Sequence, residues 1–285
     1  ALTSDGLLVI NPKNNSNQEM VHIINIITGK TSKIICPRIV VKADANSKMT
    51  ILEEFIDISG HSSLTNAVTF IDAKEGSEVQ HHRISSGADG YHIGNLKCDL
   101  NKDAKFTSSS LAFGGEVSRI NIDVRLKEPG ASCDLSGLFL GFQEETIDHH
   151  TTIEHAASNT HSNEIFKGVM GGKSKGIFNG KVIVEKNISG VKASQSSNNL
   201  LLSEVADINT KPELEIYSDD VSCAHGATVG QLDHDSIFYL RTRGIPEEDA
   251  RNMLVEAFIE NALSNVPIPS IQKEVKKIIR ASRFN

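Results

Sequence analysis

Hydrophobic and polar residues alternate in short runs along the chain up to about residue 240. In one run, apolar side chains recur at every second position, and polar residues stand between them. Its apolar members are Ile120, Ile122, Val124 and Leu126. A period of two is typical of a β-strand, in which successive side chains point to opposite faces. Gly, Asn, Asp or Ser follows most runs, so the pattern predicts many short strands joined by turns.

Similar runs recur at short intervals with no helical spacers between them. They predict strands at residues 21–27, 37–41, 48–58, 64–70, 120–126, 133–139, 177–184, 199–202, 214–217 and 221–230. An ordinary β-sandwich uses only about 100 residues. So long a series of strands is better accommodated by the stacked rungs of a solenoid than by a sandwich or a barrel. We therefore predict an all-β solenoid of the β-helix type, although no strict repeat motif identifies it.

The last segment has a helical pattern instead. Pro246 is followed by acidic residues, which is typical of a helix start, and Pro269 opens a second helix. The first helix carries an apolar stripe at helical spacing, composed of Ala250, Met253, Leu254, Ala257 and Phe258. The sequence thus predicts a β-helix core domain over residues 1–238 and a C-terminal helical domain over residues 239–285. These helices either seal the solenoid or dock a partner, and their spacing leaves both open.

Candidate chemistry lies in the last predicted strand, residues 221–230. Cys223 and His225 are two positions apart there and share a face. A thiolate and an imidazole can bind iron, zinc or copper, but two protein ligands make only half of a tetrahedral site. On spacing alone, a buried cysteine and a hydrogen-bonded histidine in the core are the favoured interpretation, because free cysteine is among the most buried residue types.

Two other segments suggest chemistry that their spacing does not support. Residues 168–174 look like a phosphate-binding loop, but Lys167 stands where the pattern G-x-x-x-x-G-K-[ST] requires glycine, so we expect turn glycines. Histidines gather between residues 149 and 161 without the order H-E-x-x-H. His149 and His150 begin two alternating polar faces, so a polar ladder on the solenoid surface is favoured over a metal-dependent hydrolase.

Composition narrows the classes of protein further. Lys and Arg number 29 against 36 Asp and Glu, for a net charge of -7, so we expect no nucleic-acid partner. The four cysteines, Cys36, Cys98, Cys133 and Cys223, form no C-x-x-C pair, which argues against a self-contained metal cluster and fits a reducing compartment. The sequence has no apolar run of about 18 residues and no signal-peptide pattern at its start, so we expect a cytoplasmic protein without a membrane partner.

Several segments together resemble the SufB/SufD family of iron-sulfur cluster assembly proteins. They are KGV at 167–169, GKSKGIFNGKV at 172–182, NLLLS at 199–203, TKPELEIY at 210–217, CAHGAT at 223–228 and FYLRTRGI at 238–245. The likeness is dense from about residue 149 to 258 and weaker upstream. The phrase CAHGAT is SufD-like, and residues 194–198 lack the cysteine that the SufB branch carries as its proposed cluster-building thiol. The chain is therefore most similar to the SufD branch.

The resemblance implies a right-handed parallel β-helix with a small helical domain, acting as a non-enzymatic scaffold beside a SufB-like subunit and a SufC-like ATPase. His225 falls on the histidine that the family uses at the SufB–SufD interface, and Cys223 is its neighbour, so a second subunit would complete the half-site. The resemblance also places the SufC docking surface on the helical tail. The candidate residues there are Tyr239, Leu240, Arg241, Arg243, Met253, Leu254, Ala257 and Phe258.

The resemblance implies no resident cofactor in the isolated chain. An iron-sulfur cluster would be held transiently in the complex, and whether a reduced flavin joins that complex stays open. The isolated chain could form a homodimer through free strand edges. The alternative function is a secreted-type β-helical enzyme acting on a polysaccharide, and the absence of Trp and of an export signal argues against it. The family's amino-terminal helical region lies outside the residues that carry the resemblance.

Overall fold

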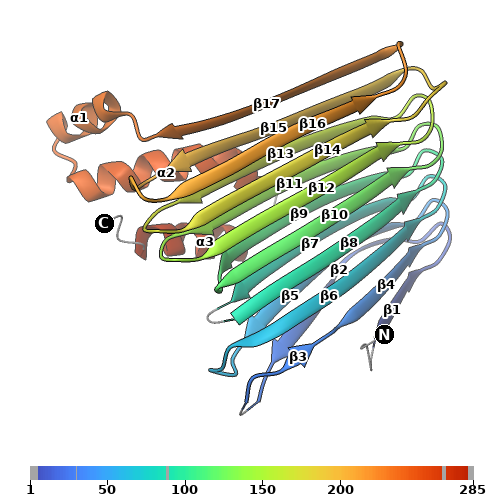
Figure 1. Cartoon of the computed structure of the whole chain (residues 1–285). Coiled ribbons are helices and arrows are strands. Elements are labelled where there is room, and N and C mark those ends of the chain that lie inside the picture. Colours follow the sequence, from blue (N-terminus) through green and yellow to red (C-terminus); the bar gives the residue numbers. More distant parts are fainter. Residues whose placement is uncertain (1–5, 30, 88–89, 265–267, 282–285) are drawn as a thin grey trace.

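The protein folds as a parallel β-solenoid followed by three helices (Figure 1). The computed structural model describes residues 6–29, 31–87, 90–264 and 268–281. Two sheets face each other. Sheet A has the order β1 (Leu7–Asn11), β4 (Arg38–Ala43), β6 (Ser63–Ala73), β8 (Gly90–Leu100), β10 (Val117–Leu126), β12 (Thr146–His155), β14 (Lys175–Val184) and β16 (Asp207–Ile216), and β3 (Ile34–Ile35) pairs with β6.

Sheet B is built from the strands that alternate with those of sheet A along the chain. Its order is β17 (Val221–Gln231), β15 (Val191–Leu201), β13 (His161–Met170), β11 (Ser132–Gly141), β9 (Lys105–Gly114), β7 (Glu78–Gly87), β5 (Lys48–Asp57) and β2 (Ser16–Ile27). Neighbouring strands are parallel in both sheets. The predicted parallel β-helix is confirmed.

The space between the sheets, which we call the lumen, is filled by side chains. Apolar columns run along it, such as Cys98, Val124, Ile153 and Val182, which occupy one register position of successive strands of sheet A. Because the strands are parallel and in register, each lumen side chain contacts the same position of the rungs above and below. Burial of these columns is the main apolar stabilisation of the fold.

One line of turns joins the rungs through left-handed residues. Asn46 (φ 56°), Gly76 (φ 66°) and Asp103 (φ 54°) occupy this conformation, which Gly, Asn and Asp tolerate best. The N–H of each donates to a carbonyl of the next turn, those of Glu75, Lys102 and Pro129 respectively. The Gly, Asn and Asp punctuation of the sequence therefore marks the turns, as predicted.

The helices cover part of the outer face of sheet B. They are α1 (His234–Thr242), α2 (Glu247–Ser264) and α3 (Pro269–Ala281). Val255 and Ile259 of α2 pack with Leu138 of β11 and Val169 of β13 in a second apolar cluster. The Lys167 ammonium, at the same face, donates to a backbone carbonyl of α2. The helices are thus fastened to the rungs near the C-terminal end of the solenoid (Figure 1). No helix in the described part of the chain has the length and apolar character to cross a membrane.

Candidate functional site

Strand β17 is the last rung of sheet B. It pairs with β15 in a register that places Cys223 beside Ala193 and His225 beside Gln195. Among the described residues, no strand pairs with its other edge. The backbone N–H and C=O groups of such an edge can accept a strand from another chain. Most side chains of β17 are exposed, because no further rung covers them among the described residues.

Cys223 and His225 lie at the open end of the lumen. Cys223 packs partly against the lumen core, and strand alternation places His225 on the same face. Cys223 is half-buried and His225 is exposed, because no further rung covers them. Burial raises the pKa of the Cys223 thiol, an effect partly offset by a hydrogen bond with the Ala193 backbone. A metal would therefore have to displace a proton from this thiol.

The donor set at this rung is incomplete. Within the described residues, no group of three or more His, Cys, Asp or Glu side chains is arranged to hold a metal ion. Cys223 and His225 offer one sulfur and one nitrogen donor, which is half of a tetrahedral set. This chemistry suits a thiophilic metal or cluster whose remaining ligands come from outside the chain.

A short polar column lies directly beneath His225 in the lumen. Gln195 is buried one rung below, and Glu164 is buried one rung further down, at the same register position. The Gln195 Nε2 donates to Glu164 Oε2 at 2.6 Å. Burial raises the pKa of the Glu164 carboxyl to about 7, although the bond from Gln195 opposes the shift. Sequence analysis missed both residues, because nothing in their spacing showed that they share a column with His225.

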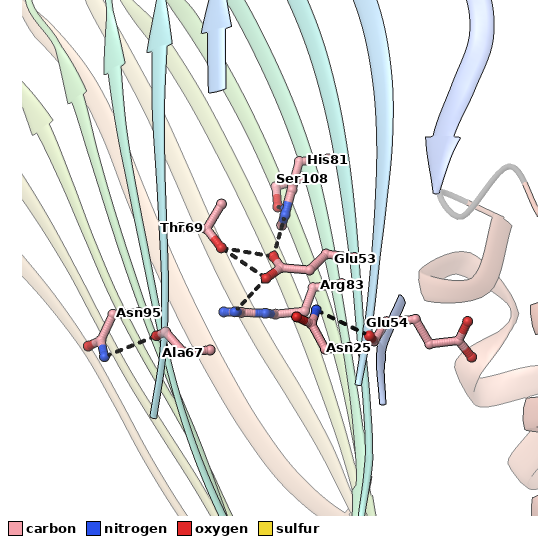
Figure 2. Close-up of polar contacts among 9 residues, drawn as sticks. All are labelled: Asn25, Glu53, Glu54, Ala67, Thr69, His81, Arg83, Asn95 and Ser108. Atoms are coloured by element: carbon pink, nitrogen blue, oxygen red, sulfur yellow. Dashed lines mark hydrogen bonds and ion pairs between the residues drawn. The ribbon is translucent and has the colours of Figure 1, made fainter. Parts of the chain in front are cut away.

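A second buried polar group lies deeper in the lumen (Figure 2). Glu53 accepts hydrogen bonds from Thr69 at 2.9 and 3.0 Å, from His81 Nε2 at 3.1 Å and from Arg83 Nη2 at 3.2 Å. His81 Nδ1 in turn lies 3.3 Å from Ser108 Oγ. Burial alone would raise the pKa of Glu53, but the Arg83 charge and the His81 bond lower it to about 2. The carboxylate is thus held ionised inside the solenoid.

The prediction that the histidines between residues 149 and 161 form a polar ladder on the solenoid surface was wrong for two of them. His149 is fully buried in the lumen, 3.1 Å from Ser110 Oγ, and burial lowers its pKa to about 3. His155 is buried, with its Nδ1 2.8 Å from Thr160 Oγ1 and its Nε2 2.9 Å from Ser162 Oγ. The alternation was read correctly, but it could not tell the inner face of the strand from the outer one.

The segment at residues 168–174 does not form a phosphate-binding loop. Gly168 lies inside β13, where a Cβ would overlap the Phe139 ring, and Gly172 occupies the turn at φ 56°. The segment continues into a strand, β14, so no helix N-terminus is present to bind phosphate. The prediction of turn glycines holds for Gly172 and is wrong for Gly168, which packs against a neighbouring rung.

The residues assigned to partner binding divide into two groups. Tyr239, Arg241, Arg243, Met253 and Ala257 are exposed, whereas Leu240, Leu254 and Phe258 are half-buried. Arg243 lies over the Tyr239 ring at 5.1 Å, and Arg241 pairs with Glu247 at 3.1 Å. Phe258 packs against the cluster beneath the helices. Phe238, which sequence analysis did not single out, is 68% exposed on α1.

The fold and this rung define a β-solenoid protein whose open end presents a half-buried cysteine and an exposed histidine on one face. Residues 25–258 match the family model described as SUF system FeS cluster assembly, SufBD core domain. The chain therefore belongs to the SufBD core family.

Individual relatives agree with this assignment. An iron-sulfur cluster assembly SufBD family protein of Synechocystis is 29% identical over 97% of this chain and 63% of its own length. The iron-sulfur cluster assembly protein SufD of Escherichia coli is 30% identical over 84% of this chain and 57% of its own length. The SufD of Plasmodium falciparum is 29% identical over 87% of this chain and 17% of its own length. The chain thus spans less than two thirds of these relatives.

Proposed function

We propose that this chain is a SufD-like scaffold subunit in iron-sulfur cluster assembly, with Cys223 and His225 handling iron or nascent cluster. The observation that supports this most directly is the exposure of His225 beside Cys223 at an unpaired strand edge, in a member of the SufBD core family. The cluster is cargo, and a second subunit supplies the missing ligands when it closes over the rung.

The partner at this rung is a SufB-like subunit, which pairs through the free edges of β16 and β17. Both strands end their sheets in the described part of the chain. Apolar side chains accompany the unpaired backbone, with Val229 45% and Tyr217 53% exposed. Backbone pairing and apolar burial together favour association of a matching strand edge. In isolation the same edge would accept a second copy of this chain, which gives the homodimer.

The helical tail docks a SufC-like ATPase. Phe238, Tyr239 and Met253 are 68%, 57% and 49% exposed, and aromatic and Met side chains are enriched in the cores of protein interfaces. Arg241 and Arg243 supply charged contacts beside them. The opposite side of α2 is fixed to sheet B, so movement of the ATPase would be transmitted to the rungs.

In this proposal the chain itself is non-enzymatic, and ATP hydrolysis belongs to the SufC-like partner. Cys223 and His225 provide two of the four ligands typical of a structural metal site, so we expect the isolated chain to have no resident cofactor. A reduced flavin, where one takes part, belongs to the assembled complex.

The test of cluster handling is His225→Ala, measured for complex assembly and for cluster content after reconstitution. We expect assembly to be retained and cluster content to be lost, with a smaller loss for Cys223→Ser. His61→Ala removes an exposed histidine from a distant turn and is the matched control. Unchanged cluster content in His225→Ala would remove the histidine from the mechanism.

The test of docking is substitution on the exposed face of the tail. Tyr239→Ala and Met253→Ala should each weaken capture of the ATPase about tenfold or more, without altering thermal unfolding. Deleting the tail is a poorer test, because it would uncover Leu138 and Val169 on sheet B. Undiminished capture by both variants would place the ATPase elsewhere.

A further inference from the structure

The Gln195 carbonyl is an unused acceptor beneath His225. Gln195 is 3% exposed, and its Oε1 has no hydrogen-bond partner among the described residues. Its amide is already oriented, since Nε2 donates to the Glu164 carboxyl at 2.6 Å. With Nε2 committed to the rung below, Oε1 is the end of the amide that remains for the rung above. A buried acceptor without a partner is unfavourable by about 1–3 kcal/mol, so a donor there would be stabilised.

The next residue in the column is His225. It is the direct register neighbour of Gln195, it points to the same face, and its exposed ring can turn about two side-chain bonds. A neutral imidazole carries one N–H donor and one acceptor nitrogen. We propose that Glu164 and Gln195 are positioning residues for His225: Glu164 fixes the Gln195 amide, and Gln195 Oε1 accepts the ring N–H of His225. The other ring nitrogen is then left unprotonated and directed to the open end.

This inference rests on the proposed function for its purpose but not for its geometry. In a histidine that binds a metal, the N–H of the second ring nitrogen usually donates a hydrogen bond to a carbonyl or carboxylate, which fixes the tautomer. Removing such a partner typically lowers metal affinity about 10- to 100-fold. Glu164 and Gln195 would act through His225 and would not touch the cargo.

The test measures the neutral tautomers of His225 in the full chain at pH 8 by ring ¹⁵N chemical shifts. Its signals are assigned by their loss in His225→Ala. Gln195→Met keeps the length of the side chain and removes the acceptor, so the tautomer ratio should change about 2- to 10-fold. Glu164→Gln keeps an acceptor for the Gln195 amide and should preserve the wild-type ratio. Ser194→Ala, on the outer face of the same strand, is the control for disturbance of β15.

The outcomes separate the two proposals. A tautomer ratio that agrees within twofold between the wild type and folded Gln195→Met would overturn the positioning role. Should Gln195→Met not fold, Glu164→Leu removes the anchor of the amide instead, and an unchanged ratio there would overturn it equally. If His225→Ala loses its clusters but the tautomer ratio is the same in the wild type and in Gln195→Met, the proposed function is supported and the positioning role is overturned. If the tautomer ratio changes in Gln195→Met but His225→Ala has a normal cluster content, the positioning contact is supported and the proposed role of His225 in cluster handling is overturned.

Discussion

Replacing Glu53 by Gln tests whether the buried ion pair stabilises the solenoid. In the folded chain the Arg83 charge and the bond from His81 oppose the effect of burial and hold the pKa of Glu53 at about 2, against an ordinary value of 4.5. This difference corresponds to about 3 kcal/mol in favour of the ionised, folded state. The substituted glutamine would keep the shape of the side chain and leave the Arg83 guanidinium, which is 2% exposed, without its counter-charge.

The pH dependence follows from the direction of the shift. Between pH 4.5 and 2 the unfolded chain binds more protons at this carboxyl than the folded chain does. The stabilisation is therefore complete above about pH 5 and is lost as the pH falls towards 2. A protonated Glu53 resembles Gln, so the wild type and Glu53→Gln should converge in acid. The unfolding free energies of the wild type and Glu53→Gln should differ by about 3 kcal/mol at pH 7. This difference should be smaller by about 1 kcal/mol at pH 4 and by about 2 kcal/mol at pH 3.

The assay is urea unfolding followed by far-ultraviolet circular dichroism, because the chain has no Trp to report by fluorescence. Glu54→Gln is the matched control. Glu54 is the next residue, and its side chain points away from the Glu53 group (Figure 2). It pairs with the exposed His22 at 2.9 Å, so loss of its charge should change stability by less than about 1 kcal/mol. An equal difference between Glu53→Gln and the wild type at pH 7 and pH 4 would refute the electrostatic argument.

Two further substitutions test packing between rungs and under the helices. Gly172→Ala should lower the unfolding free energy by about 1–3 kcal/mol more than Gly60→Ala. Both glycines are left-handed, but only at Gly172 would a Cβ overlap the Phe142 carbonyl. Equal losses of stability in urea unfolding would show that the turn at Gly172 shifts to accommodate the Cβ. Lys167→Met should lower stability by about 1–3 kcal/mol and weaken hydrogen-exchange protection of α2, because it removes the donor to the Phe258 carbonyl. Unaltered protection would mean that apolar packing alone holds the helix.

The sequence predicted some strands from the apolar alternation of their own lumen positions. Strand β10 is read from its own alternation, with Ile120, Ile122 and Val124 all buried. Strands β7 and β13 were not predicted, because their lumen positions include His81, Arg83 and Glu164. Such residues interrupt the apolar pattern, and the partners that make their burial tolerable are 28 to 31 residues away along the chain. Alternation describes one strand and contains no information about the rung beside it.

The sequence likewise predicted one property of the candidate site and not the other. That Cys223 and His225 share a face follows from the period of two, which is local. Their exposure does not follow, because it depends on β17 having no successor in sheet B among the described residues. The favoured interpretation from spacing, a pair buried in the core, would apply to the same residues one rung earlier. Position within the stack, which composition and spacing do not encode, decides between burial and access.

Under the proposed function, this dependence on position explains how one lumen column serves a structural role along its length and a binding role at its end. Inside the stack, a polar lumen residue has a neighbour above and below, so Gln195 can anchor itself on Glu164 and remain buried. At the last described rung the upper neighbour is missing, and the same register position becomes accessible in His225. In the proposed arrangement, such a column orients its terminal side chain from below and leaves the other side open. Completing the stack with a second subunit would therefore restore burial and supply ligands in a single step, which a site enclosed within one chain does not allow.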